Sequence, residues 1–250
     1  TIMVSQLGAF AIAAIGLTAQ PKFICLAVFM SLNVAVSALV ARRKGENDRE
    51  GANRVLAQAI TLTLLFSIVI TVLAIVFAEP VLRLAGTNKD THESAVVYFR
   101  IISGGMIFNV LTMVINAAQR GAGNTKIAMK TNLISNGVNI VFNYLLIGGN
   151  LGFPRLGVAG AAIATVLGTI VALGMAICSV SHPTGFLHLR FSRDMIRLRR
   201  ETLATIVNIG SSSLAEQLFL RFGFLTYTMI VARLGTSAFA AHQVGMNVIT

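Results

Sequence analysis

The chain has 250 residues, of which 55% are hydrophobic and 12% are charged, and its formal net charge is +11. Its mean hydropathy of +0.78 excludes an ordinary soluble domain and is typical of membrane proteins. The positive charge does not indicate nucleic-acid binding, because 13 of the 20 Lys and Arg residues fall in three short connections between apolar runs. A nucleic-acid-binding protein would instead need a continuous basic face with polar or aromatic side chains that read bases.

Apolar runs long enough to cross a bilayer, which takes roughly 20 residues, follow one another along the chain. Residues 1–6 predict the end of a first helix, and an eighth helix is predicted to begin near Ser237. Pro21 predicts a break in the second helix, and residues 23–41 suffice to cross, so Lys22 is expected at the far membrane surface. The predicted fold class is all-α, a polytopic membrane helix bundle, with the helices between the first and the eighth at 10–41, 55–78, 94–118, 127–147, 158–180 and 202–231.

Residues 1–20 recur at residues 228–247, with identical residues at seven positions that include the Leu-Gly pairs 7–8 and 234–235. This spacing is too long for a solenoid and indicates a duplicated bundle. Six helices separate the copies, an even number, so the two bundles are expected to be parallel repeats. We expect a protein of about two such units, with 1–181 as an N-terminal six-helix lobe whose first helix is truncated, 182–200 as a linker and 201–250 as the start of the C-terminal lobe.

The three basic connections at 41–54, 119–130 and 182–200 hold 13 Lys and Arg residues against six on the opposite side. Because basic loops stay in the cytoplasm, this asymmetry predicts that these three connections are cytoplasmic, in a multi-pass protein of the cell membrane. The last connection has alternating apolar and arginine residues, so we expect an amphipathic segment on the membrane surface. Its residues expected against lipid are Phe186, Leu187, Leu189, Phe191, Met195, Ile196 and Leu198.

Glu216 is the one acidic residue in the middle of a predicted span, in the segment NIGSSSLAEQLFLRFG. A charge in hydrocarbon is costly, so an ionisable residue there is a functional candidate, suited to exchange a proton or a monovalent cation. The alternative is an ion pair with Arg221, five residues away and outside the favourable helical spacing.

A stripe of amides, Asn132, Asn136, Asn139 and Asn143, steps by four, three and four along the fifth span and so lies on one helix face. Unsatisfied amides cannot face lipid. They bind either a neighbouring helix or a water-filled cavity. Thr165 in the sixth span has the same two alternatives, or its hydroxyl satisfies its own helix backbone. His242 and Gln243 in the eighth helix are also polar, and Gln243 is included among the candidate binding residues.

Neither a metal site nor an enzymatic site is indicated by the remaining residues. Cys25 and Cys178 lie inside apolar runs without paired spacing or a nearby His, so they predict no disulfide framework and no zinc site. The segment GAGNTK lacks the spacing and context of a nucleotide-binding loop, so ATP hydrolysis is not expected.

The sequence resembles the multidrug and toxic compound extrusion (MATE) family of cation-coupled antiporters. The stretches that carry the resemblance span nearly the whole chain in the family's order: LGAFAIAAIGL, AVVYFRI, QRGAGNTK, GVAGAAIAT and VARLGTSAFAAHQV. The resemblance implies twelve helices in two six-helix lobes, with a central cleft that opens alternately to the two sides of the membrane. It further implies export of amphipathic organic cations in exchange for protons or sodium ions, with no cofactor besides the coupling ion.

The resemblance also assigns roles to individual residues. Glu216 resembles the acidic residue of the seventh helix in the C-terminal lobe, Asn139 and Asn143 resemble a polar pair that lines the N-terminal lobe cavity, and Thr165 resembles a hydroxyl on the neighbouring helix. Many members have an aspartate in place of Asn143, and the family's first-helix aspartate would lie before Thr1. Glu216 is therefore the residue expected to couple ion movement to transport.

Two other functions are open to a chain of this kind. A flippase for a lipid-linked anionic precursor would line its cleft with arginines, whereas only Arg221 falls within a predicted span. A membrane scaffold without transport would have no water-accessible cavity. The expected partners are membrane lipids and small amphipathic cations, with no nucleic acid, and the protein is expected to be a monomer.

Overall fold

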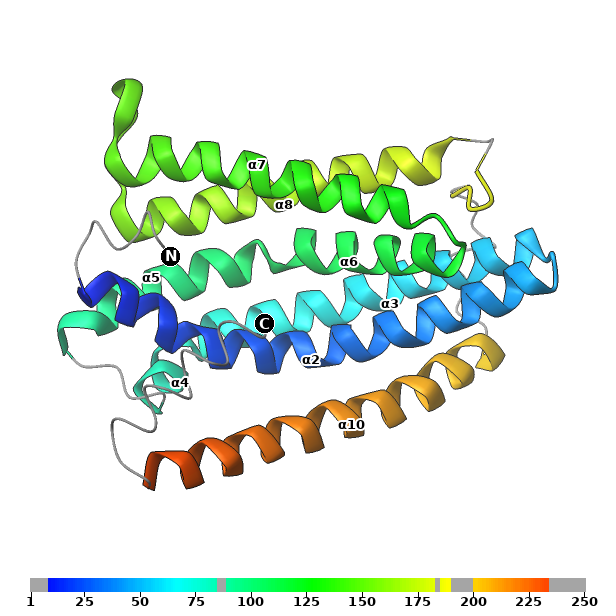
Figure 1. The fold of residues 1–250 in the computed structure, drawn as a ribbon, viewed down its shortest axis with the longest axis horizontal. Helices are drawn as coiled ribbons and strands as arrows, with labels where there is room; N and C mark the ends of the chain where they lie inside the picture. The colour runs from blue at the N-terminus through cyan, green and yellow to red at the C-terminus, as the bar shows by residue number, and fades with distance from the viewer. Residues whose placement is uncertain (1–8, 85–88, 183–184, 190–199, 234–250) are drawn as a thin grey trace.

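The computed structural model describes residues 9–84, 89–182, 185–189 and 200–233. Within these ranges the chain is helical and has no strand, so the predicted all-α bundle is confirmed. Figure 1 shows long helices that run side by side. In chain order they are α2 (Ala9–Gly45), α3 (Arg49–Val76), α4 (Ala78–Leu84), α5 (Lys89–Gly104), α6 (Met106–Gly121), α7 (Thr125–Gly148), the short 3₁₀ helix η1 (Asn150–Gly152), α8 (Gly157–Ser181) and α10 (Arg200–Arg233).

By length and composition, α2, α3 and α8 could each cross a membrane, and α5 with α6 forms a fourth such span bent by 45°. Many apolar side chains of α3 are exposed, as lipid-facing side chains would be. They include Leu65, Phe66, Ile68, Val69, Val72, Leu73 and Val76. The predicted second helix continues through Pro21 without ending. The Leu-Gly pairs of the repeat lie outside the described residues, so the duplication stays a prediction.

The predicted fourth span is two helices rather than one. α5 ends at Gly104 and α6 begins at Met106, and Gly105 lies between them. Two consecutive glycines favour this break because glycine is a poor helix former. A Cβ on Gly105 would lie 2.3 Å from Val166 Cγ2, so the bend also lets α8 come close.

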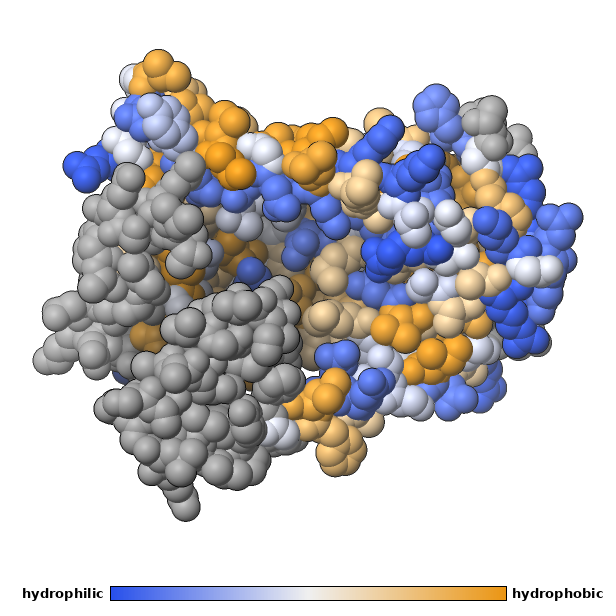
Figure 2. Space-filling model, viewed as in Figure 1, coloured by the Kyte–Doolittle hydropathy of each residue, from blue (hydrophilic) through white to orange (hydrophobic). Residues whose placement is uncertain are grey.

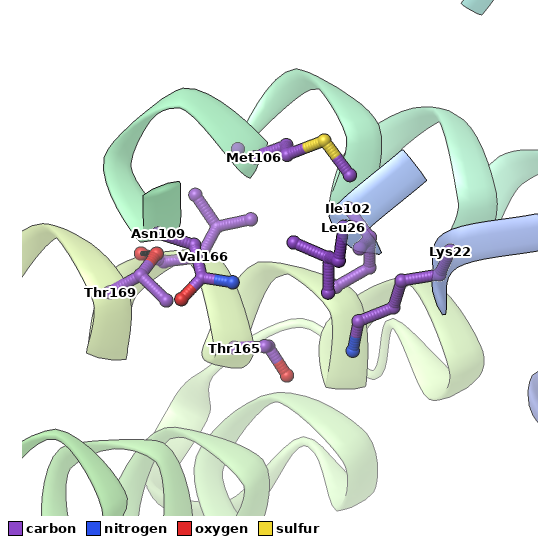
Figure 3. A pocket seen from close by; sticks show the side chains of 9 residues that line it. Lys22, Leu26, Ile102, Met106, Asn109, Thr165, Val166 and Thr169 are labelled. Atoms are coloured by element: carbon purple, nitrogen blue, oxygen red, sulfur yellow. Dashed lines mark hydrogen bonds between the residues drawn. The ribbon is translucent and has the colours of Figure 1, made fainter. Parts of the chain in front are cut away.

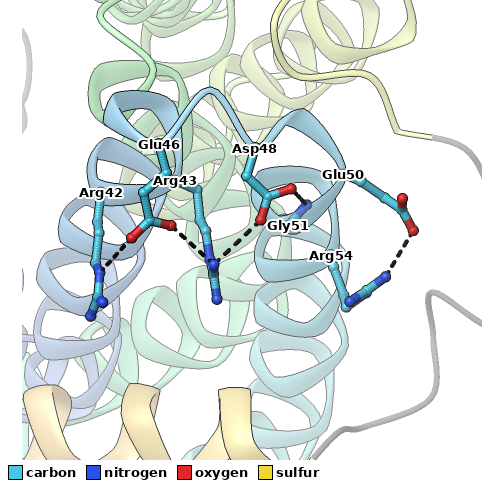
Figure 4. A network of polar contacts seen from close by, with 7 residues as sticks. All are labelled: Arg42, Arg43, Glu46, Asp48, Glu50, Gly51 and Arg54. Carbon is cyan, nitrogen blue, oxygen red and sulfur yellow. Dashed lines mark hydrogen bonds and ion pairs between the residues drawn. The ribbon is translucent and has the colours of Figure 1, made fainter.

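The first basic connection, between α2 and α3, is held by a local polar network (Figure 4). Asp48 caps α3 by accepting a hydrogen bond from the Gly51 amide at 2.8 Å. Arg43 bridges Asp48 at 3.3 Å and Glu46 at 3.1 Å. The side chains of this network are exposed, and exposed ion pairs stabilise a fold only weakly. Its consequence is therefore mainly local: the capped turn fixes how α2 reverses into α3.

The first basic connection contacts each of the other two at one end of the bundle. Lys44, at the end of α2, donates to the carbonyl of Ala122, which follows α6. Arg49, at the start of α3, donates to the carbonyl of Gly185, which follows α8. The Asn53 side chain accepts from the His188 amide at 2.7 Å. The basic residues of the described part of these connections thus gather where α2, α6 and α8 end.

The prediction that residues 186, 187 and 189 lie against lipid is wrong. Leu187 is 1% exposed and belongs to the largest buried apolar cluster, which joins α2, α3, α6, α8 and α10, and Phe186 and Leu189 pack against that cluster. The segment 185–189 is not an amphipathic helix. Its backbone instead finds partners in Arg49, Asn53 and the Val180 carbonyl, 2.8 Å from the Leu189 amide, and so its apolar side chains turn inward. The rest of the predicted surface set, from Phe191 to Leu198, lies outside the described residues.

Glycines let α7 and α8 approach each other closely along their length (Figure 1). A Cβ on Gly160 would lie 2.6 Å from the Leu146 carbonyl oxygen, and one on Gly168 would lie 2.9 Å from the Ser135 carbonyl oxygen. The Ser135 hydroxyl donates in turn to the Gly168 carbonyl at 2.9 Å. Small residues that allow backbones to meet are typical of helix pairs in membranes.

We predict that Gly160→Ala destabilises the protein by about 1–3 kcal/mol, because the added methyl group would push α8 away from α7. Gly174→Ala is the matched control in the same helix, since a Cβ there meets nothing within 4 Å. The control should be neutral, or stabilising by up to about 1 kcal/mol through helix propensity. Thermal unfolding midpoints in detergent measure both effects, and equal midpoints would contradict the proposed close contact.

Candidate functional site: a polar cluster between helices α7 and α8

The amide stripe of α7 divides into two parts. Asn139 and Asn143 are partly buried and hydrogen bonded, whereas Asn132 and Asn136 are exposed. The Asn143 amide donates to Asn139 Oδ1 at 2.9 Å, and the Asn139 amide donates across to Thr165 Oγ1 on α8 at 3.1 Å. The inner part of the stripe therefore joins two helices, as one of the two alternatives predicted.

Thr165 ends this chain of hydrogen bonds. Its hydroxyl accepts from Asn139 and donates to the Ala161 carbonyl at 2.9 Å, so it satisfies its own helix and also binds α7. Asn143 Oδ1 is buried and has no donor among the described residues. The polar cluster Asn139, Asn143 and Thr165 thus retains one unused acceptor in an apolar surrounding.

Thr165 also lines a cavity of about 30 Å³ beside the bend at Gly105 (Figure 3). Such a volume holds roughly one water-sized group. The cavity lies where α2, α5, α6 and α8 meet, and its lining is Lys22, Leu26, Ile102, Gly105, Met106, Asn109, Thr165, Val166 and Thr169.

Lys22, which the sequence predicts at the far membrane surface, lines this cavity. Its side chain extends from α2 into the space beside Thr165 and Val166 (Figure 3). Because α2 continues through Pro21, Lys22 lies within a helix rather than at the end of one. Sequence reasoning missed Lys22 as a candidate, although a basic residue within an apolar run was a visible signal.

The other predicted site residues lie elsewhere. Glu216 is exposed on α10, one turn after the buried Ser213, and α10 packs against α2 and α3. The described structure gives Glu216 no contact with the cluster Asn139, Asn143 and Thr165. Gln243 and His242 lie outside the described residues, as does the side chain of Arg221, so the predicted alternative of a Glu216–Arg221 ion pair stays open. Figure 2 shows that the face seen in Figure 1 is hollowed between α7 and α2, with hydrophilic residues among hydrophobic ones.

A bundle of long apolar helices with hydrogen-bonded amides and a lysine between them defines a polytopic membrane protein with a polar interior. The chain belongs to the MatE family, whose family model matches residues 1–145, more than half of its length. The resemblance to MATE transporters is therefore confirmed.

Comparisons with individual proteins also indicate this family. The chain is 26% identical over 246 residues to a probable multidrug resistance protein NorM of Thermotoga maritima, covering 95% of this chain and 51% of that protein. Among solved structures, an inward-facing multidrug resistance MATE family transporter matches with a TM-score of 0.80 at 28% identity, covering 96% of this chain and 53% of that one. An outward-facing multidrug resistance MATE family transporter matches with a TM-score of 0.82 at 30% identity, covering 92% of this chain and 50% of that one. The chain thus spans about half the length of the relatives it matches.

We predict that the Asn139–Thr165 hydrogen bond contributes about 0.6 kcal/mol, and at most roughly 1.7 kcal/mol, to stability. A double-mutant cycle of Asn139→Leu and Thr165→Val, followed by unfolding in mixed micelles, measures this coupling. The control cycle pairs Asn132→Leu with Thr165→Val and should show no coupling, because Asn132 is exposed. If both cycles are additive, the amides do not join α7 to α8.

Proposed function

We propose that this chain belongs to a secondary active antiporter that exports amphipathic organic cations in exchange for H⁺ or Na⁺ by alternating access. The observation that carries the proposal is the match to one solved family member that faces inward and another that faces outward. The chain fits both architectures over more than nine-tenths of its length. The solved structures that this chain matches thus include both states that alternating access requires.

The arrangement of polar residues supports transport through the bundle. Asn139, Asn143 and Thr165 supply amide and hydroxyl groups inside the predicted N-terminal lobe, residues 1–181. Glu216 lies on α10, which is the first helix of the predicted C-terminal lobe and packs on α2 of the predicted N-terminal lobe. We assign ion coupling to Glu216, and substrate contact to Asn136, Asn139, Asn143 and Thr165, with Gln243 as a further contact.

The flippase alternative is not favoured by the described cavity. An anionic lipid precursor would require several arginines, whereas the cavity beside Gly105 has one basic residue, Lys22. Nor do we assign any catalytic residue, because a transporter of this kind moves its substrate without changing covalent bonds.

We further propose that the protein is a monomer of the cell membrane with its three basic connections in the cytoplasm. Two observations support this orientation. The first connection contacts each of the other two at one end of the bundle, and the three hold the majority of the basic residues, which favours the cytoplasmic side.

Replacement of Glu216 by Gln is expected to reduce ion-driven efflux of a fluorescent cation from proteoliposomes to the level of empty vesicles. The amide keeps the size of the side chain but cannot exchange a proton or hold a cation by charge. Glu50→Gln is the control, because Glu50 is an exposed acid at the start of α3 that pairs with Arg54 at 2.8 Å. Unchanged efflux in Glu216→Gln, with the control also active, would remove Glu216 from the mechanism.

Thiol labelling at the two ends of α7 tests the orientation. After replacement of Cys25 and Cys178, Leu151→Cys should react with a membrane-impermeant maleimide on intact cells, whereas Lys126→Cys should react only after permeabilisation. Both side chains are exposed, Leu151 by 85%, so access to the reagent is set by the membrane alone. The reverse pattern would show that the basic connections face outward.

A further inference from the structure

Lys22 is a half-buried cation without a described partner, and it lines the cavity among α2, α5, α6 and α8. No carboxylate among the described residues lies within ion-pairing distance of its ammonium group, and none of the nine residues that line its cavity is acidic. A basic side chain inside a membrane-spanning bundle is costly unless it has a partner or a function. The described structure supplies no partner for Lys22, so the cavity is a candidate site for a ligand.

The hydrogen-bonding groups of the cavity favour an anion. Both hydroxyl protons are already used within α8, since Thr165 donates to the Ala161 carbonyl and Thr169 donates to the Val166 carbonyl at 2.7 Å. The Asn109 side chain has no hydrogen-bond partner among the described residues, so its amide protons are available together with the ammonium protons of Lys22. The free donors therefore come from Lys22 and Asn109.

The walls and size of the cavity limit what enters it. Leu26, Ile102, Met106 and Val166 make the remaining walls apolar, which strengthens a hydrogen bond to a charged group by excluding water. A volume of about 30 Å³ admits one small head group and not a whole drug-sized molecule. The rest of a ligand must lie outside this cavity.

We propose that Lys22 and Asn109 bind the carboxylate of the transported amphiphile, so that this protein selects substrates that carry an anionic group besides their cationic one. The assignment rests on the proposed export function and deepens it: the substrate class becomes zwitterionic amphiphiles rather than simple organic cations. Lys22 supplies the charge, and Asn109, from α6, fixes the direction of approach.

A matched pair of fluorescent dyes tests this assignment. One is a xanthene dye methyl ester, which is a monocation, and the other is the corresponding free acid, which is a zwitterion. Purified protein in detergent should bind the free acid about tenfold more tightly than the ester, as expected for a hydrogen-bonded charge pair. Lys22→Met should abolish this preference and leave ester binding unchanged, whereas Lys22→Arg should retain it.

The control is Lys126→Met, which removes an exposed lysine of α7 that does not line the cavity and should leave both affinities unchanged. If Lys22→Met does not yield monodisperse protein, Lys22→Gln makes the same test with a polar neutral side chain. Equal affinity of the unmutated protein for the two dyes would overturn the proposal. An equal loss of affinity for both dyes in Lys22→Met would also overturn it, because that result would indicate a structural role for Lys22.

The same dyes separate this inference from the proposed function. Binding is measured without any ion gradient, so it reports on Lys22 whether or not the protein is an antiporter. Failure of a proton or sodium gradient to drive efflux of either dye from proteoliposomes would count against the antiporter. A preference for the free acid that depends on Lys22 would still support the anion site.

Discussion

The lack of water in the hydrocarbon core of a membrane is the constraint on which the described structure depends. Each backbone amide and carbonyl there must find its partner within the protein, which is why the described chain is a series of helices. The same constraint applies to side chains. It turns Asn139 toward Thr165, and it makes a charge such as that of Lys22, which has no partner among the described residues, informative.

Close backbone contact makes these polar contacts possible. Gly160 and Gly168 allow α8 to approach α7 to a distance at which any larger residue would collide with a carbonyl oxygen. At that separation the short side chains of Ser135, Asn139 and Thr165 reach across the interface. Gly105 has a different effect, because the bend between α5 and α6 leaves a small cavity next to Val166. Glycine positions therefore determine both where the bundle is tight and where it has space.

Much of the fold could be predicted from the sequence because apolar run length and basic loops are strong one-dimensional signals. The helices α3, α7 and α8 lie close to their predicted ranges, and the four-three-four spacing of the asparagines correctly predicted a shared face. That spacing could not show which asparagines turn toward α8, because the answer depends on where the neighbouring helix lies. Asn139 is bound there and Asn136, three residues earlier, is exposed.

Errors arose where tertiary contacts override a local pattern. The segment 185–189 has the composition of a membrane-surface peptide, yet Arg49 and Asn53 satisfy its backbone, and Leu187 is buried in the core. Pro21 was predicted to break the second helix, with Lys22 beside the break at the far membrane surface. α2 continues through Pro21, and the lysine points inward. The hydrogen bond from Arg49 to Gly185 joins residues 136 positions apart, beyond the reach of any local pattern.

The charges at Lys22 and Glu216 together suggest why a transporter would favour an anionic group on its substrate. Lys22 lies in a cavity among α2, α5, α6 and α8, whereas Glu216 lies on α10, across α2 from them. In the proposed mechanism the coupling ion neutralises Glu216, and the carboxylate of the substrate would neutralise Lys22. The loaded protein would then have a partner for each of the two charges as it passes between its two openings. Because an uncompensated charge in a membrane is costly, the constraint that shapes the fold also favours the proposed anionic group on the substrate.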